Sequence, residues 1–435
     1  MVSDVLIMQI NAQSYITSIT SYPDFSHITD AAGLLTPRRI VSAYNIPANN
    51  GANVKIGIIS LAGGWSATDF NNSMTDLGLH SLITSSNITT VLVDGATSGS
   101  TDSSGGENTL DLYCVAGMAP SANIVLYVGN VGTSQNWANV FQRAIDEKCD
   151  IITHSWGTTE AYGDFLSAPL ANAAAKGITV FVAAGDNGSE PFASANVQAV
   201  QYPASSANVV SVGGTNLQTS YGFGNVRLTE TVEFHDGFSS TWGSAGGISS
   251  IIPLPDYQRG LTYRQYFQAN STVGPSTSLT ARGIPDIAAA MNAYGLWYNG
   301  VVSGFGGTSA AAPIMAGMFA RFMSMNGGRR PVPGAIHKIL YSNLNSYYDI
   351  TTGNNATVTY LNGYAASSNW DPVTGLGVPW GNLVYPMVTS GGTTIKTVAN
   401  TWSYVSNVKV KTAANTWSNV KSIYTKTING WQQTY

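Results

Sequence analysis

GITVFVAAG, at residues 177–185, is a short run of Val, Ile and Phe between glycines. Continuous apolar runs of this length, rich in β-branched residues, are typical of strands buried on both faces. Three amphipathic stretches, at 105–118, 136–148 and 165–176, alternate with such runs. This alternation predicts one large α/β domain around a mainly parallel sheet, with the active site at the carboxyl ends of the strands. Four more runs of this kind are VKIGIISL (54–61), NIVLYVG (123–129), DIITHSW (150–156) and NVVSVGG (208–214).

The chain is poor in ionisable groups. Of its 435 residues 44% are hydrophobic, but only 10% are charged, against roughly 25% in a typical soluble domain. A surface of this kind gains little self-repulsion as the pH falls, which favours an extracellular or acidic setting. The net charge of −4, with Arg329-Arg330 as the longest basic run, gives no reason to expect nucleic-acid binding.

The two cysteines, Cys114 and Cys149, lie in or beside apolar segments. We expect two buried free thiols, and one disulfide between them is the alternative. No apolar run approaches the ~18 residues of a membrane span. Residues 1–33 are polar and weakly patterned, do not resemble a secretory signal, and are expected to form an arm or leader.

The last segment, residues 391–435, differs from the rest. Trp402, Trp417 and Trp431 recur in similar surroundings, as in TVANTWSYVSNVKV (397–410) and TAANTWSNVKSIYT (412–425). Alternating Val, Tyr and Thr predict β-hairpins, so we expect a small β-rich repeat appendage. Repeats this short must stack on one another or on a partner, so the appendage is either an attachment module or a cap on the main domain.

The first candidate catalytic segment is GFGGTSAAAPIMAGMFA, at residues 304–320. Glycines lead to Ser309, and an Ala-rich apolar segment then predicts a helix. A serine at a helix N-terminus is an ordinary N-cap residue, but its neighbouring N–H groups also favour developing negative charge. Ser309 is therefore a candidate nucleophile.

A serine nucleophile needs a base, and none of the five histidines lies in a glycine-rich catalytic context. His154, within a predicted strand, is expected to be a core histidine. In GGENTLDLYCVAGMAP (105–120), Glu107 and Asp111 are four residues apart and so lie on one face of a helix. Such a pair can share a proton and act as a base, and the alternative is a solvated acidic face.

The third element is FVAAGDNGSE, at residues 181–190. It places Asp186 on a turn at the carboxyl end of a buried strand, which on its own is a common position for Asp. Together, the ExxxD pair, the GD turn and GTSAAAP (307–313) resemble the sedolisin family, the serine-carboxyl peptidases with a subtilisin-like fold. The resemblance continues through HSWG (154–157) and RGIPDIAAA (282–290), and covers residues 34–385. We therefore expect a sedolisin-like peptidase domain at residues 34–390.

The resemblance implies a three-layer subtilisin-like domain and a role for each residue. Glu107 would take the proton from Ser309, and Asp111 would orient Glu107. Asp186, protonated, would donate a hydrogen bond to the oxyanion. The resemblance also implies one structural calcium ion, held by YYDITTG (347–353) and SSNWDPVTGLG (367–377). The expected ligands are the carboxylates of Asp349 and Asp371 and the main-chain carbonyls of Ile350, Ser367 and Asn369.

Three departures from the family pattern accompany the resemblance. Ser367 and Asn369 stand where relatives usually have glycine. Ser60 stands where some relatives carry a glutamate that extends the carboxylate network. Relatives are made with a long folding prosegment, whereas only residues 1–33 precede the matching region here, so the segment is either removed or replaced by another route of folding.

These observations predict an endopeptidase that acts on proteins or peptides in acid. A tripeptidyl-peptidase of the same family is the first alternative, because the family contains both. The second is a particle-surface structural or attachment protein that uses residues 391–435 and keeps the peptidase fold as a scaffold. The expected location is extracellular or particle-associated.

Overall fold

The computed structural model describes residues 34–98, 103–190, 197–219, 227–232, 242–356 and 362–389, with six short strands between 394 and 433. The arm or leader expected at residues 1–33 lies outside the described residues. No described helix is both long and apolar enough to cross a membrane.

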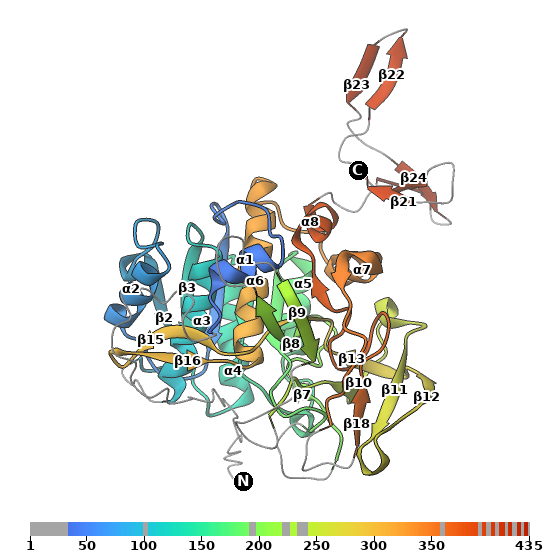
Figure 1. The fold of residues 1–435 in the computed structure, drawn as a ribbon. Helices are drawn as coiled ribbons and strands as arrows, with labels where there is room; N and C mark the ends of the chain where they lie inside the picture. The colour runs from blue at the N-terminus through green and yellow to red at the C-terminus, as the bar shows by residue number, and fades with distance from the viewer. Residues whose placement is uncertain are drawn as a thin grey trace, which may run out of the picture.

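A twisted sheet of eight strands forms the centre of the molecule (Figure 1), and the predicted runs supply five of its strands. Seven strands are parallel, and the eighth, β9 (Arg227–Val232), pairs antiparallel with β8. The prediction of a mainly parallel sheet is confirmed. In spatial order the parallel strands are β14 (Ile287–Ala290), β8 (Val210–Thr219), β6 (Thr179–Ala183), β4 (Ile151–His154), β1 (Lys55–Ser60), β3 (Asn123–Val128) and β2 (Ile88–Leu92).

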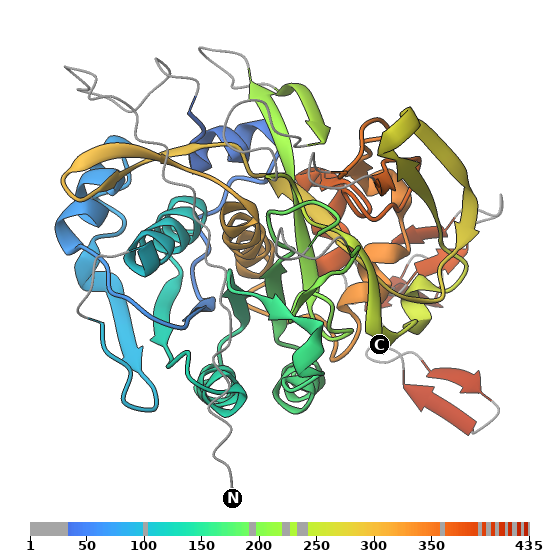
Figure 2. The ribbon, with the colours of Figure 1, turned by 90° about the horizontal axis from the view of Figure 1, so that it is seen from below.

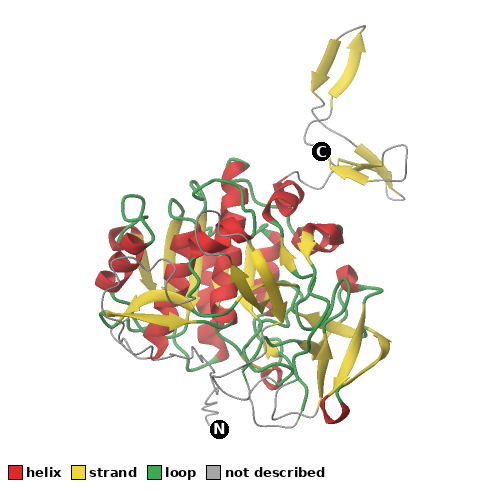
Figure 3. Ribbon diagram, viewed as in Figure 1, coloured by secondary structure: helices red, strands yellow, loops and turns green. Residues whose placement is uncertain are grey.

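Helices cover both faces of this sheet and complete a three-layer subtilisin-like α/β fold (Figure 3). Figure 2 shows α3 and α6 side by side on one face, nearly end-on, with α4 and α5 on the other. The described helices are α1 (Pro37–Ala43), α2 (Ala67–Asp76), α3 (Ser103–Met118), α4 (Ser134–Asp146), α5 (Ser167–Ala175), α6 (Thr308–Met325), α7 (Ile336–Tyr341) and α8 (Gly381–Thr389).

The two helices that carry the candidate residues are core helices. From Thr308 to Met323 every residue of α6 is buried, and from Gly105 to Met118 so is every residue of α3. Glycines set their separation, because a Cβ at Gly317 would lie 2.4 Å from the Cβ of Met118. The close packing brings α3 directly against α6, although the two helices are far apart in the sequence.

Antiparallel additions surround the sheet, most of them at its right in Figure 1 and the β15–β16 pair at its left. The largest is a three-stranded sheet in the order β12-β11-β18. The described pairs and strands are β5 (Thr158–Thr159) with β7 (Gln201–Tyr202), β10 (Gly247–Pro253) with β13 (Ala281–Ile284), β11 (Thr262–Phe267), β12 (Thr272–Ser278), β18 (Asn362–Ala365), β15 (Tyr294–Tyr298) with β16 (Val301–Phe305), and β17 (Tyr347–Tyr348) with β19 (Val378–Pro379).

Beyond α8, the structure describes three antiparallel strand pairs. Each of the three repeated tryptophans lies opposite a lysine in one of these pairs. The side chains of this segment lie outside the described residues, so the appendage remains a prediction. The pairs are β20 (Thr394–Lys396) with β21 (Trp402–Tyr404), β22 (Lys409–Ala413) with β23 (Thr416–Asn419), and β24 (Tyr424–Thr427) with β25 (Gly430–Gln433).

The predicted free thiols are confirmed. Cys114 on α3 and Cys149 before β4 are both buried and form no disulfide. Burial raises the pKa of each thiol, to about 11 for Cys149, so both are neutral packing groups.

Candidate active site

Ser309 occupies the second position of α6, directly after a glycine-rich turn. Gly307 precedes the helix with a φ of 104°, a left-handed conformation that favours glycine. A Cβ at Gly307 would also lie 2.6 Å from Oδ2 of Asp186. Four residues after Ser309, Pro313 lacks the N–H that would normally bond to the main-chain carbonyl of Ser309. The serine is therefore fixed by its neighbours, while its own carbonyl is left available.

The first N–H groups of α6 are partly occupied. The N–H of Thr308 donates to Oδ1 of Asp186 at 2.7 Å, and the N–H of Ala310 donates to the carbonyl of Gly307 at 2.9 Å. The N–H of Ser309 has no acceptor among the described residues. Because helix N-termini favour negative charge, this N–H is suited to an oxyanion that forms at Ser309.

Glu107 and Asp111 lie on α3, and both are 0% exposed. A solvated acidic face is therefore excluded, because α3 has no solvated face along this part of its length. The packing of α3 against α6 places the carboxylate pair beside the N-terminal half of the helix that carries Ser309. We call Glu107 and Asp111 the dyad.

Burial dominates the electrostatics of the dyad. Loss of hydration raises the pKa of both carboxyl groups, and the charge of Glu107 raises the pKa of Asp111 further. For Glu107, the hydroxyl of Ser309 lowers the pKa, Asp186 raises it, and the hydroxyl of Ser155 lowers it again. Two buried carboxyl groups this close hold one proton between them over a range of acidic pH.

Neither oxygen of Glu107 makes a hydrogen bond of ordinary length to a described residue. The hydroxyl of Ser309 is nevertheless close enough to lower the pKa of Glu107. Hydrogen bonds of this kind often reach their full strength only when substrate binds.

Asp186 lies on the turn after β6, at the carboxyl edge of the sheet as predicted. Its Oδ1 accepts the N–H of Thr308 at 2.7 Å and the hydroxyl of Thr308 at 2.8 Å. Its Oδ2 has no hydrogen bond to a described residue and lies against Gly307. Burial raises the pKa of Asp186 to about 6, although the bonds from Thr308 lower it. Once protonated on Oδ2, this carboxyl group can donate toward the N-terminus of α6.

One functional residue was missed at the sequence level. Ser155 follows β4, and its hydroxyl donates to Oδ1 of Asp111 at 2.7 Å. The same hydroxyl lies 3.4 Å from the main-chain carbonyl of Ser309. The only available signal was its position in HSWG, directly after a predicted buried strand.

The position of Ser60 shows how the network ends. Its hydroxyl donates to the carbonyl of Ala62 at 2.9 Å and makes no bond to the dyad. Nearby in the core, the indole N–H of Trp156 is buried and has no partner among the described residues. Ser60 therefore does not extend the dyad, and the described side chain bonded to it is Ser155.

No described histidine is placed to serve Ser309. His154 is buried on the α4 face of the sheet, where its ring contacts Trp137 and Phe141. Successive strand residues point to opposite faces, so His154 and Ser155 point away from each other. Its Nδ1 lies 3.1 Å from the carbonyl of Ile59, and burial lowers the pKa of the ring to about 4. It is the core histidine that was predicted.

The proposed calcium ligands lie close together in a loop beside β17. The N–H of Asn369 donates to Oδ2 of Asp349 at 2.8 Å, and the N–H of Ser367 donates to Oδ2 of Asp371 at 2.9 Å. Oδ1 of Asp349 is buried and has no partner among the described residues. Asn369 adopts a left-handed φ of 68°, so the glycine conformation survives the substitution.

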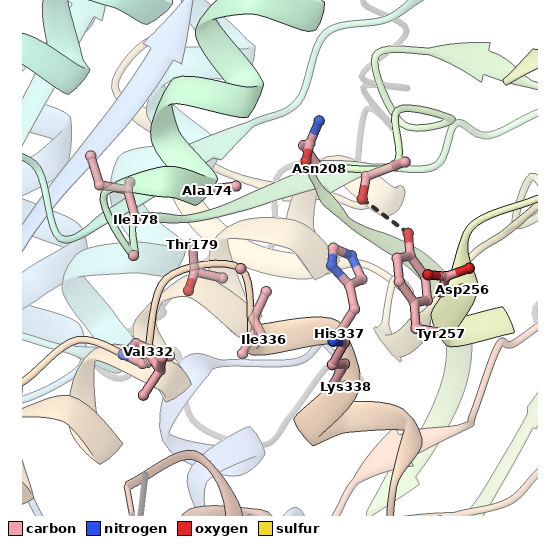
Figure 4. Close-up of a pocket in the computed structure, with 14 residues that line it drawn as sticks. Ala174, Ile178, Thr179, Asn208, Asp256, Tyr257, Val332, Ile336, His337 and Lys338 are labelled. Atoms are coloured by element: carbon pink, nitrogen blue, oxygen red, sulfur yellow. Dashed lines mark hydrogen bonds between the residues drawn. The ribbon is translucent and has the colours of Figure 1, made fainter. Parts of the chain in front are cut away.

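A separate cavity of about 140 Å³ lies between α5, α7 and the 3-10 turn Asp256–Gln258 (Figure 4). In it the ring of His337 stacks on Tyr257, with 4.2 Å between the ring centroids. The polar groups are already engaged: the hydroxyl of Tyr257 donates to the carbonyl of Ala207 at 3.0 Å, and Nε2 of His337 lies 2.7 Å from the carbonyl of Val209. None of the predicted site residues lines this cavity.

Several known proteins are similar to this chain in sequence or in structure. Residues 59–332 match the subtilase family. The chain is 33% identical to kumamolisin of Bacillus sp. (strain MN-32), over 80% of this chain and 62% of that protein. It is 36% identical to tripeptidyl-peptidase SED1 of Arthroderma otae, over 41% of this chain and 28% of that protein.

The solved structure of Pseudomonas sedolisin, a serine-carboxyl proteinase complexed with two molecules of pseudo-iodotyrostatin, is also similar. It superposes with a TM-score of 0.68 at 26% identity, over 84% of this chain and all of that one. The chain thus spans less than two thirds of the two curated relatives and the whole of this solved domain. From its sequence, its fold and its relatives, the chain belongs to the subtilase family and, within it, to the sedolisins, the serine-carboxyl peptidases.

Proposed function

We propose that the protein is an acid-active serine-carboxyl endopeptidase. The observation that carries this proposal is the buried Glu107–Asp111 dyad, packed beside the helix N-terminus that presents Ser309. No described histidine competes for the role of base. Membership of the sedolisin family supports the same reaction class.

The proposed reaction has two halves. Ser309 Oγ attacks the scissile carbonyl carbon, and its proton passes to the ionised carboxylate of Glu107. The oxyanion accepts hydrogen bonds from protonated Asp186 and the N–H of Ser309. Glu107 returns the proton to the leaving amine as the C–N bond breaks, which leaves an acyl-enzyme on Ser309. Water then loses a proton to Glu107 and attacks the acyl carbon. As the bond from this carbon to Ser309 Oγ breaks, Glu107 returns the proton to Oγ, which releases the acid and restores the serine.

Opposite protonation demands predict a bell-shaped dependence of activity on pH. The dyad must carry a negative charge, so activity falls as the pH drops below the lower pKa of the pair. Asp186 must be neutral, and its pKa of about 6 means that activity falls as the pH rises through that value. The measurement is kcat/KM on a denatured protein between pH 2 and 8. Full activity at pH 8 would contradict the assignment of Asp186.

A tripeptidyl-peptidase is the second candidate, favoured by the match to tripeptidyl-peptidase SED1. Mass spectrometry of the products separates the two. An endopeptidase yields fragments of many lengths from a protein whose N-terminus is blocked by acetylation. A tripeptidyl-peptidase releases three-residue peptides and leaves the blocked protein uncut.

For the segment 391–435 we propose an attachment role outside the cell or on a particle surface. The three short strand pairs and the low charge of the chain support this proposal. A variant that ends at residue 390 separates the alternatives. Retained cleavage with loss of surface binding supports attachment, and a lower melting temperature supports a cap on the peptidase domain.

We propose that the loop of Asp349 and Asp371 holds one structural Ca²⁺. Two carboxylates, an unpartnered buried oxygen on Asp349, and the main-chain carbonyls of Ile350, Ser367 and Asn369 form an all-oxygen donor set, which suits calcium. A bound ion would offset the repulsion between the two carboxylates and stabilise the loop.

Removal of calcium is expected to lower the melting temperature of the protein by about 3–4 °C, because an ion at 100 times its Kd contributes about 2.7 kcal/mol and the unfolding entropy of a domain this large is high. The measurement is thermal unfolding with and without a chelator. Asp349→Asn is expected to have the melting temperature that the parent shows with the chelator, and adding the chelator should not change it. Asp146→Asn, at a carboxylate 60% exposed on α4, is the control that keeps the parent response. A parent that ignores the chelator would contradict the site.

A further inference from the structure

The hydroxyl of Ser155 joins two parts of the site. It is 2.7 Å from Oδ1 of Asp111 and 3.4 Å from the main-chain carbonyl of Ser309. Ser155 is 6% exposed, so water has little access to compete for these contacts. It comes from the end of β4, whereas Asp111 lies on α3 and Ser309 on α6, so one hydroxyl connects three elements of the core.

Both acceptors are unusually available. Pro313 has no N–H, so the carbonyl of Ser309 lacks its usual helical donor. Asp111 accepts no hydrogen bond from any other described side chain, and its Oδ2 has no described partner. Ser60 cannot substitute, because its hydroxyl is bonded to Ala62.

A hydroxyl group has a single hydrogen, so it can serve only one of these acceptors at a time. While the dyad carries its negative charge, part of which lies on Asp111, the shorter bond to this carboxyl group is the stronger one. When the dyad takes up the proton of Ser309, the negative charge on Asp111 falls and that bond weakens. The hydroxyl can then turn to the carbonyl of Ser309 without movement of any heavy atom.

We propose that Ser155 is a positioning residue whose hydroxyl alternates between Asp111 and the main-chain carbonyl of Ser309 as the dyad gains and loses its proton. This inference rests on the proposed function and adds a residue to its machinery. In this role Ser155 holds the dyad in its ionised form before attack and anchors the nucleophile's own backbone afterwards.

The charges around the dyad make this hydroxyl important. The groups that act on Glu107 and Asp111 are the two carboxyl groups themselves, Asp186, and the hydroxyls of Ser309 and Ser155; Cys114 on α3 also faces Asp111. None of them is a cation. Of the described groups, Ser155 and Ser309 are the two that favour the ionised form, so loss of the Ser155 hydroxyl raises the pKa of the dyad. The acid limb of the activity profile then moves to higher pH.

The test compares Ser155→Ala, Ser155→Thr and a matched control across pH 2 to 8. The control is Thr215→Val, which removes another buried hydroxyl bonded to a buried carboxylate, that of Glu230 at 2.6 Å. Ser155→Ala is expected to lose about 10- to 100-fold in kcat, with KM near that of the parent and an acid limb about one pH unit higher, because a hydrogen bond to a charged group is lost. Ser155→Thr restores the hydroxyl and should restore the acid limb. Thr215→Val should keep the parent profile.

The outcomes separate this inference from the function on which it rests. If the parent cleaves and Ser309→Ala does not, but Ser155→Ala keeps the parent acid limb, the inference is wrong and the proposed function stands. If the parent does not cleave at all, both are wrong. If Ser155→Ala does not fold, Ser155→Cys, with its weaker S–H donor, must show the same shift of the acid limb, and an unshifted limb in that variant overturns the inference.

Discussion

Replacing Ser309 with Ala is expected to abolish peptide-bond cleavage, with a loss on the order of 10⁶-fold in kcat, because the attacking oxygen is removed. Glu107→Gln is expected to cost nearly as much. The Gln side chain keeps the shape of Glu107 but cannot take the proton of Ser309. The measurement is the rate of cleavage of a denatured protein at the pH optimum of the parent.

The double variant sharpens this prediction. Nucleophile and base act as one unit, so Ser309→Ala combined with Glu107→Gln is expected to be no slower than Ser309→Ala alone. The control is Glu230→Gln, at a buried carboxyl group that pairs with Arg227 and not with the dyad. It should retain cleavage wherever it remains folded. Cleavage by Ser309→Ala at the parent rate would exclude the serine mechanism.

Two substitutions of Asp186 are expected to have opposite consequences. Below pH 6, where the carboxyl group of the parent is protonated, Asp186→Ala removes an oxyanion donor and is expected to lower kcat by about 10²–10³-fold. Asp186→Asn is expected to retain much of the activity. Oδ1 of Asp186 accepts both the N–H and the hydroxyl of Thr308, so an Asn in the same place would turn its amide NH₂ to the position of Oδ2.

The pH profile distinguishes this account from a merely structural role for Asp186. An amide donates at every pH, whereas the carboxyl group donates only below its pKa of about 6. The alkaline limb of the Asp186→Asn profile should therefore move to higher pH. Its acid limb, which the pKa of the dyad sets, should stay where it is in the parent. The measurement is kcat/KM from pH 2 to 8, and an unmoved alkaline limb would contradict a donor role for Asp186.

The strands were predictable because their signal is local. Runs of Val and Ile buried on both faces identify β1, β3, β4, β6 and β8 wherever they lie in the sheet. The ends of the strands were less predictable. The run at 150–156 was predicted as one strand, but β4 ends at His154, and Ser155 lies just past it. That small difference hid a side chain of the site.

Ser155 shows which part of the site could not be predicted from the sequence. Its partners, Asp111 and Ser309, are 44 and 154 residues away in the chain, and no spacing in the sequence links them. The dyad differs, because two carboxylates four residues apart share a helix face wherever that helix lies. Asp349 and Asp371 were paired only through the family resemblance, and the folded loop brings them together.

The sequence by itself thus determined the short-range geometry of the site. It specified the shared face of Glu107 and Asp111, the glycine turn before Ser309, and the proline that releases the carbonyl of Ser309. Tertiary packing supplied everything that depends on water and on distant neighbours. The pKa of a carboxyl group is shifted by loss of hydration, and α3 loses its hydration only because α6 and the sheet close around it. Spacing therefore identified the acids, and burial turned them from surface charges into a candidate base and its support.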